Sequence, residues 1–195
     1  MRRIIGIICI VLGIMCLLGS AGFVVYNRME SESARESSQD LLEKTQQIIV
    51  QNVKADIIPE PSEESSEPAM AFPMPSVQVD GHNCIGILSI PALELELPVL
   101  SGWDYDKLQI APCQYYGSCY EPNFVIAAHN YESHFGRLSE LQADDPVFFI
   151  DLAGTIHNYK VYLLETLQPT ATEEMLTSGF DLSLYTCTPG GGSRV

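Results

Sequence analysis

The segment LSLYTCTPGGGSRV, residues 182–195, is the most informative part of this chain. An apolar strand runs into Cys187, a glycine-rich turn follows, and Arg194 stands seven positions after the cysteine. Upstream, the segment FVIAAHN, residues 124–130, predicts a second strand that ends in His129. A cysteine, a histidine and an arginine, each at a strand end, are the components of a thiol acyl-transfer site.

Short strand patterns extend on both sides of these segments. Residues 93–97 alternate strictly between Leu and Glu, which is typical of a strand with one face in water, and Pro91 and Pro98 bracket that strand. Helical signals are brief and lie near 105–110 and 173–178, each behind a capping residue. Many short strands with only small helices indicate a mainly β fold, an antiparallel barrel or a sandwich. The expected strands are 85–90, 93–97, 124–128, 147–152, 156–167 and 182–187.

The N-terminus carries a membrane-spanning pattern. Residues 4–26 are uncharged and apolar, and as a helix they would span about 34 Å, enough for a bilayer core. Arg2 and Arg3 precede this run, so the N-terminus should stay cytoplasmic and the rest of the chain should face outward. A cleaved signal peptide is the alternative, but its apolar region would be only about 7–15 residues long. We therefore expect residues 1–26 to form a retained signal-anchor in the cell membrane.

Residues 27–80 have the composition of an acidic stalk. Apolar residues at helical spacing over 30–54 predict an amphipathic helix, which lies on the domain or pairs with a second copy. Residues 57–76 are rich in Pro, Ser and Glu and predict an extended, flexible spacer. The outward domain then covers residues 81–195.

Charge and cysteine usage narrow the possible partners. The formal net charge of −15 argues against nucleic acid as a partner, because phosphate binding needs clustered Lys and Arg.

The cysteines fall into two groups. Cys9 and Cys16 lie within the membrane run and are expected to be inert. Outside the membrane disulfides are permitted, and Cys113 and Cys119 can either close a small loop or stay free. No CxxC pair is present, which argues against structural zinc and thioredoxin-type redox chemistry.

Four segments together resemble the sortases, the membrane-anchored cysteine transpeptidases of Gram-positive bacteria. Residues 85–93 (IGILSIPAL) resemble the opening strand of the sortase barrel, and residues 124–130 resemble the strand that delivers the catalytic histidine. Residues 134–138 (HFGRL) resemble the stretch that follows. Residues 183–189 (SLYTCTP), with Arg194, resemble the TLxTC signature and its downstream arginine. The resemblance implies a sortase-like antiparallel β-barrel with short helices, and it leaves the sortase class open.

The resemblance also implies a role for each site residue. Cys187 is the nucleophile, His129 is the general acid and base, and Arg194 stabilises the developing oxyanion or orients the substrate. The implied reaction cleaves an LPxTG-like sorting signal of a surface or pilin protein between Thr and Gly, through a thioacyl intermediate. An amine then takes the acyl group, from a lipid-linked peptidoglycan precursor of the cell wall or from a pilin lysine. His134, the rival histidine, is expected to contact loop backbone.

No cofactor is expected and no metal site is assigned. Calcium binds to part of the family, and several acidic residues raise that idea, but none of them shows a ligand spacing that supports it. These residues are Glu94, Glu96, Asp144, Asp145 and Glu165.

Three departures from the family pattern concern Ala128, where glycine is usual, Ser183, where threonine is usual, and the end of the chain at Val195. The sortase barrel normally continues as a strand beyond the arginine, so we expect the final strand to be truncated. An alternative function is therefore a catalytically impaired, membrane-tethered β-domain that binds peptide. L,D-transpeptidases and NlpC/P60 peptidases fit less well, because the former carry an SHGC-like run and the latter place Cys before His.

Overall fold

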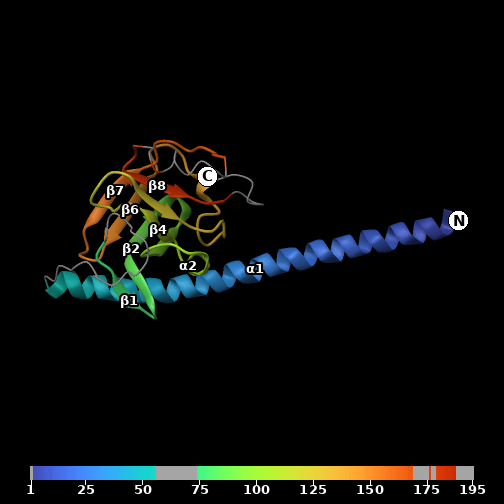
Figure 1. Cartoon of the computed structure of the whole chain (residues 1–195), viewed down its shortest axis with the longest axis horizontal. Helices are drawn as coiled ribbons and strands as arrows, with labels where there is room; N and C mark the ends of the chain where they lie inside the picture. The colour runs from blue at the N-terminus through green and yellow to red at the C-terminus, as the bar shows by residue number, and fades with distance from the viewer. Residues whose placement is uncertain (1, 56–73, 169–175, 177–178, 188–195) are drawn as a thin grey trace. The chain divides into compact units, whose positions relative to one another are not determined.

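The structure is a computed structural model that describes residues 2–55, 74–168, 176 and 179–187 (Figure 1). It divides into two compact units, residues 1–33 and residues 34–195. Most of the expected spacer at 57–76 and of the expected helix at 173–178 lies outside the described residues. The elements are α1 (Arg2–Ala55), β1 (Val77–Val79), β2 (His82–Ile90), η1 (Pro91–Leu93), β3 (Leu95–Leu100), α2 (Tyr105–Leu108), β4 (Cys113–Tyr116), β5 (Phe124–Ala127), η2 (Leu138–Glu140), β6 (Pro146–Asp151), β7 (Ile156–Lys160) and β8 (Leu182–Tyr185).

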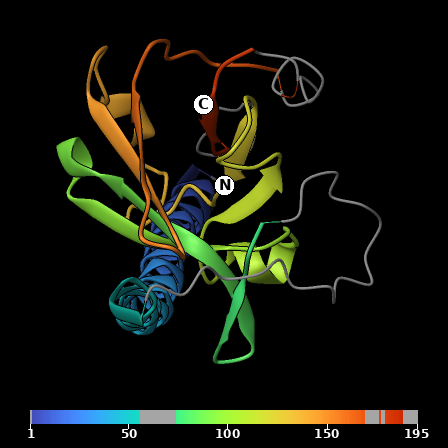
Figure 2. The same ribbon diagram turned by 90° about the vertical axis from the view of Figure 1, so that its left-hand side faces the viewer.

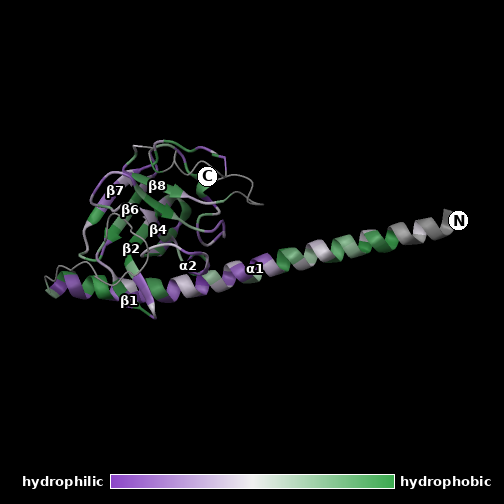
Figure 3. Cartoon of the chain, viewed as in Figure 1, coloured by the Kyte–Doolittle hydropathy of each residue, from purple (hydrophilic) through white to green (hydrophobic). Residues whose placement is uncertain are grey.

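The first unit is the N-terminal part of α1. This helix is long and apolar enough to cross a membrane, and the side chains from Ile10 to Tyr26 are exposed. Apolar residues dominate this part of the helix (Figure 3). α1 continues unbroken to Ala55, so the expected anchor and the expected helix at 30–54 belong to one element.

The second unit is built on one eight-stranded sheet that forms a nearly closed barrel. The strand order is β7-β6-β2-β3-β4-β5-β8, and β1 pairs with β2 off this path. The expected mainly β, barrel-like fold is confirmed. Most ladders are antiparallel, but β3 pairs with β4 and β5 pairs with β8 in parallel. A parallel β5–β8 pair places the ends of both strands at the same edge of the sheet.

Apolar side chains from most of the strands fill the barrel. Phe124 of β5 and Phe149 of β6 are fully buried and meet edge to face, with ring centroids 5.1 Å apart. Phe135, from the loop after β5, is buried in the same cluster. The core therefore fixes β5 and the loop that follows it, which are the segments that position His129.

Most strand boundaries differ by a few residues from the expectation, and two of the differences are informative. Pro98 does not end the strand but lies inside β3, opposite Ile87. β4 pairs with β3 only at Leu100, so no neighbouring strand on that side needs an N–H from Pro98. The strand expected over 156–167 ends at Lys160.

The C-terminal part of α1 packs on the barrel within the second unit. Its buried residues recur every three or four positions and form one stripe, as expected for a helix with one face on a core. In Figure 2 the cyan end of α1 lies beside the green strands β1 and β2. Asn52 Nδ2 donates a hydrogen bond of 2.9 Å to the carbonyl of Leu152. The buried stripe consists of Ala34, Ser38, Leu41, Thr45 and Ile49.

Candidate active site

His129 follows the C-terminal end of β5, two residues after Ala127. The residues Phe124–Ala127 are all buried, so this strand is apolar on both faces. Ala128 is also buried, and its N–H donates to the carbonyl of Tyr185 on β8 at 3.1 Å. The strand contact therefore extends past the end of β5, and His129 follows as the first half-buried residue.

The register of the parallel pair places the predicted nucleophile beside this histidine. Ala127 pairs with Tyr185, and His129 and Cys187 both stand two residues beyond that pair. Neighbouring strands lie about 4.8 Å apart, so the two backbones meet at one edge of the sheet. Cys187 is a free, exposed thiol. A thiol and an imidazole at one strand edge can perform nucleophilic and acid–base chemistry together.

The loop that follows His129 contacts this histidine through a backbone hydrogen bond and an aromatic ring. The N–H of Phe135 donates to the carbonyl of His129 at 3.2 Å, and the ring of Tyr131 lies 5.0 Å from the His129 ring. Gly136 closes this loop, and a Cβ there would lie 2.5 Å from the carbonyl oxygen of Asn130. Only glycine permits that approach of two backbone segments.

His134 cannot take the place of His129. It is fully buried, and neither ring nitrogen has a hydrogen-bond partner in the described part of the chain. As expected, His134 contacts loop backbone, but it does so through its own N–H, which donates to the carbonyl of Tyr131 at 3.0 Å. Burial, with the nearby charge of His129 as a smaller cause, lowers the pKa of His134 to about 4. Its ring is neutral at physiological pH and is closed off from substrate.

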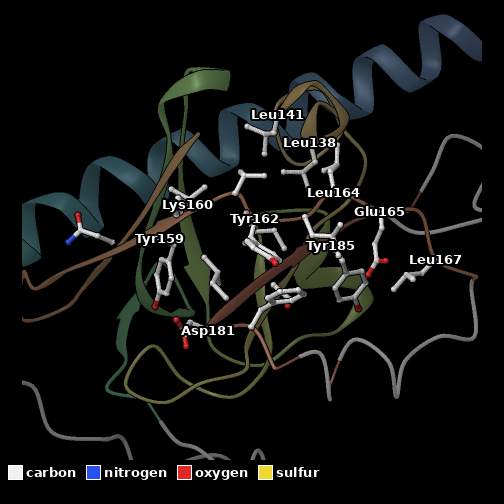
Figure 4. A pocket seen from close by; sticks show the side chains of 18 residues that line it. Leu138, Leu141, Tyr159, Lys160, Tyr162, Leu164, Glu165, Leu167, Asp181 and Tyr185 are labelled. Carbon is white, nitrogen blue, oxygen red and sulfur yellow. The ribbon is translucent and has the colours of Figure 1, made fainter. Parts of the chain in front are cut away.

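An apolar groove lies between β7 and β8 (Figure 4). Its volume is about 660 Å³. Leu182 and Leu184 of β8 form one wall, and Tyr159 and Val161 form part of the other. The residues of β8 that line the groove end at Tyr185, two positions before Cys187 in the chain.

The structure brings together two of the three predicted site residues. His129 and Cys187 share one edge, whereas Arg194 and the glycines at 190–192 lie outside the described residues. Both strand ends were marked in the sequence by an apolar run that stops at a polar side chain.

A sequence model of the Sortase domain matches residues 88–194, more than half of the chain. This chain belongs to the sortase family. Members of this family are cysteine transpeptidases, and this sortase therefore takes a sorting-signal protein as substrate and an amine as acceptor. No curated protein sequence matches this chain.

Solved structures of other sortases share the fold. Sortase C1 from Streptococcus suis is 26% identical, with a TM-score of 0.50, over 58% of this chain and 69% of that one. Sortase C-3 from Streptococcus pneumoniae is 23% identical, with a TM-score of 0.54, over 86% of each chain. Sortase A from Corynebacterium diphtheriae is 17% identical, with a TM-score of 0.54, over 90% of this chain and 92% of that one. Structures of more than one sortase class thus resemble this sortase.

A second cysteine of this sortase lies near a histidine, in a different environment. Cys119 is buried close to Asp151 and His157. Burial, and then the charge of Asp151, raise the pKa of Cys119 to about 12. A thiolate is the nucleophile in acyl transfer, so the exposed Cys187 suits that role and Cys119 does not. No sequence motif marks this cluster, and Cys113, the other half of the possible disulfide, is also a free thiol.

Two of the acidic residues that raised the idea of calcium, Asp144 and Glu94, have other contacts. Asp144 pairs with Lys160 at 2.6 Å on the surface. Glu94 adopts a left-handed conformation at the end of η1, where its N–H caps the Pro91 carbonyl. Among the described residues, these acids do not gather into a group with metal-ligand geometry.

Proposed function

We propose that this sortase cleaves an LPxTG-like sorting signal between Thr and Gly and transfers the acyl part to an amine. The observation that supports the proposal is the β5–β8 register: His129 and Cys187 each follow its last pair by two residues, and the residues of β8 line an apolar groove. The nucleophile is Cys187, the acid and base is His129, and Arg194 supplies donors to the developing oxyanion.

The reaction divides into two acyl transfers. The Cys187 thiolate attacks the Thr carbonyl carbon, the C–N bond to Gly breaks, and His129 gives its proton to the leaving amine. The product of this half is a thioacyl enzyme. The incoming amine then loses a proton to His129 and attacks the thioester carbonyl, which releases the Cys187 thiolate. The thiolate and the protonated histidine are both restored.

The groove supports an apolar, extended substrate. Its walls include Leu138, Leu141 and Val147 in addition to the leucines of β8. The Leu and Pro side chains of the sorting signal can bury their apolar surface against these residues. Such burial stabilises the complex by about 25 cal/mol per Å² of apolar surface. Thr and the scissile bond then lie next to Cys187.

The charges around the membrane span support an orientation. Arg2 and Arg3 precede the apolar part of α1 and would stay in the cytoplasm. The second unit would then face outward, where anchored surface proteins and cell-wall precursors are found.

Turnover by the full chain in detergent micelles tests this proposal. An LPxTG peptide is mixed with either a short glycine peptide, which represents a cell-wall acceptor, or a lysine-containing pilin peptide. Mass spectrometry should detect a Thr–amine product with one acceptor, and the product should be absent for Cys187→Ala and retained for Cys113→Ser. Hydrolysis or transfer that persists in Cys187→Ala would overturn the assignment. A folded protein that binds the peptide without turnover would favour the peptide-binding alternative.

A further inference from the structure

A cluster of three different metal-ligating side chains lies away from the proposed active site. Cys119 Sγ, one carboxylate oxygen of Asp151 and one ring nitrogen of His157 all lie within 4.8 Å of one another. Cys119 belongs to the β4–β5 loop, Asp151 ends β6, and His157 lies in β7. Cys119 and Asp151 are buried, and the His157 side chain is only 18% exposed.

Hydrogen bonds already orient the carboxylate of this cluster. Asp151 Oδ1 accepts from the N–H of Ala153 at 3.0 Å and of Thr155 at 2.9 Å. These two bonds leave Oδ2 directed at the other members, 3.2 Å from His157 Nε2 and 3.3 Å from the Tyr120 hydroxyl, which donates to it. Hydrogen bonds to one oxygen of a ligating carboxylate are the usual support of a metal ligand.

We propose that Cys119, Asp151 and His157 form a binding site for a divalent metal ion of the zinc type. Sulfur, imidazole nitrogen and one carboxylate oxygen are the ligands that zinc takes, whereas calcium prefers six to eight oxygens. In a tetrahedral zinc site the ligand atoms stand roughly 3.3–3.6 Å apart. The separation of 3.2 Å between Asp151 Oδ2 and His157 Nε2 is close to that value. If Cys119 Sγ moved inward by about 1 Å, all three ligand atoms would have the spacing of a tetrahedral zinc site.

The net charge of the ligands and the group available for the fourth coordination position both suit a zinc-type ion. One thiolate and one carboxylate neutralise a dication, which suits a buried site. The Tyr120 hydroxyl already contacts Asp151 Oδ2 and stands ready as a fourth ligand or as the partner of a bound water. This site departs from the expectation, based on the missing CxxC pair, that the chain holds no structural zinc.

The ion would fasten two parts of the barrel and would not take part in acyl transfer. Cys119 precedes β5 and His129 follows it, so the cluster and the active site lie at opposite ends of that strand. The bound ion would join the β4–β5 loop to the β6–β7 hairpin. The same loop holds the entry to β8, because the N–H of Asn123 donates to Phe180 and that of Phe124 donates to Asp181.

Cobalt(II) binding to the full chain in detergent tests the site directly. The protein carries Cys187→Ala, which removes the exposed thiol of the second unit, and is first freed of metal with a chelator. Cobalt is titrated in while the thiolate-to-cobalt charge-transfer band and the visible bands of tetrahedral cobalt are recorded, and zinc is then added as a competitor. The ligand variants are Cys119→Ser and His157→Gln. The matched controls are Cys113→Ser, a buried thiol in β4, and His82→Gln, a histidine of β2.

We expect one tetrahedral, thiolate-ligated cobalt per chain, displaced by zinc. Each ligand variant should weaken binding by at least about a hundredfold, because even outer partners of a metal ligand are worth 10–100-fold. Both controls should bind as before, and circular dichroism should show the same fold for all variants. His157 is partly exposed, so His157→Gln keeps the test valid if Cys119→Ser fails to fold. The proposal would be overturned if no thiolate band appeared, or if both ligand variants bound cobalt as tightly as the parent protein. Asp151 and His157 would then form an ion pair without a metal.

Discussion

His129 and Cys187 each follow the last pair of the parallel β5–β8 ladder, Ala127–Tyr185, by two residues. Their proximity depends on backbone register and not on a flexible loop. A one-residue slip between β5 and β8 would also turn alternate side chains to the wrong face, so the buried residues of β5 protect the geometry of the site.

The loop behind His129 should tolerate no side chain at position 136. In Gly136→Ala the new Cβ would meet the Asn130 carbonyl oxygen at 2.5 Å, so the loop has to move and the histidine moves with it. We expect kcat/KM to fall by on the order of a hundredfold, as for a 1 Å misplacement of a catalytic group. Kinetics with an LPxTG peptide would measure this. Gly81→Asn is the control, because Gly81 has open space around it and Asn accepts its positive φ; a similar loss in both variants would contradict the account.

The buried His134 should make the fold sensitive to acid. The pKa is about 4 in the folded chain and about 6.5 when unfolded, so between these values the unfolded chain binds more protons. The contribution of neutral His134 to the free energy of unfolding is therefore fully present above about pH 6.5 and is lost as the pH falls towards about 4. Urea unfolding at about pH 7 and about pH 5 should differ by about 2 kcal/mol from this residue. His134→Phe should remove most of that difference, and an unchanged pH dependence in this variant would refute the assignment.

The helix face on the barrel should contribute strongly to stability. Leu41 is buried against Val79, Cys84 and Leu100, so Leu41→Ala should cost about 2–5 kcal/mol in the free energy of unfolding. Val50 on the same helix is 50% exposed, and Val50→Ala should stay within about 0.5 kcal/mol. Urea unfolding of the full chain in detergent compares the two. Equal effects would show that the helix does not pack on the barrel through this face.

Substrate binding should depend on the leucines of the groove. Leu164 lines the groove and is 42% exposed, so Leu164→Gln should raise KM for an LPxTG peptide several-fold with little change in kcat. Ile156 is 55% exposed and does not line the groove, which makes Ile156→Gln the matched control. An equal rise of KM in the control would mean that the peptide binds elsewhere.

Periodicity in the sequence predicted the barrel and the two strands that carry the site. β4 was missed because Cys113–Tyr116 has no alternation, and its place depends on pairing with β5 and β3. The helix on the barrel buries Ser38 and Thr45 beside its leucine and isoleucine, and polar residues in a buried stripe carry no hydropathy signal. Local patterns therefore identified elements, but not which residues of a stripe are buried.

Contacts between distant segments were the least predictable part of the site. Nothing in the sequence near His134 indicates that its ring is buried, because its burial and its contact with the Tyr131 ring, 5.5 Å away, arise only in the folded loop. Cys119, Asp151 and His157 come from three segments with no shared motif, so only the folded barrel brings them together. The positions of His129 and Cys187 just after two strands were predictable, because an apolar run precedes each of them.

Trapping of the thioacyl intermediate would identify the cysteine that carries the acyl group. The full chain is mixed with an LPxTG peptide without an amine, quenched in acid, and digested for mass spectrometry. We predict an LPxT adduct on the peptide that contains Cys187, absent in Cys187→Ala and strongly reduced in His129→Gln. An adduct on Cys119, or one on Cys187 that forms equally well without His129, would contradict the account.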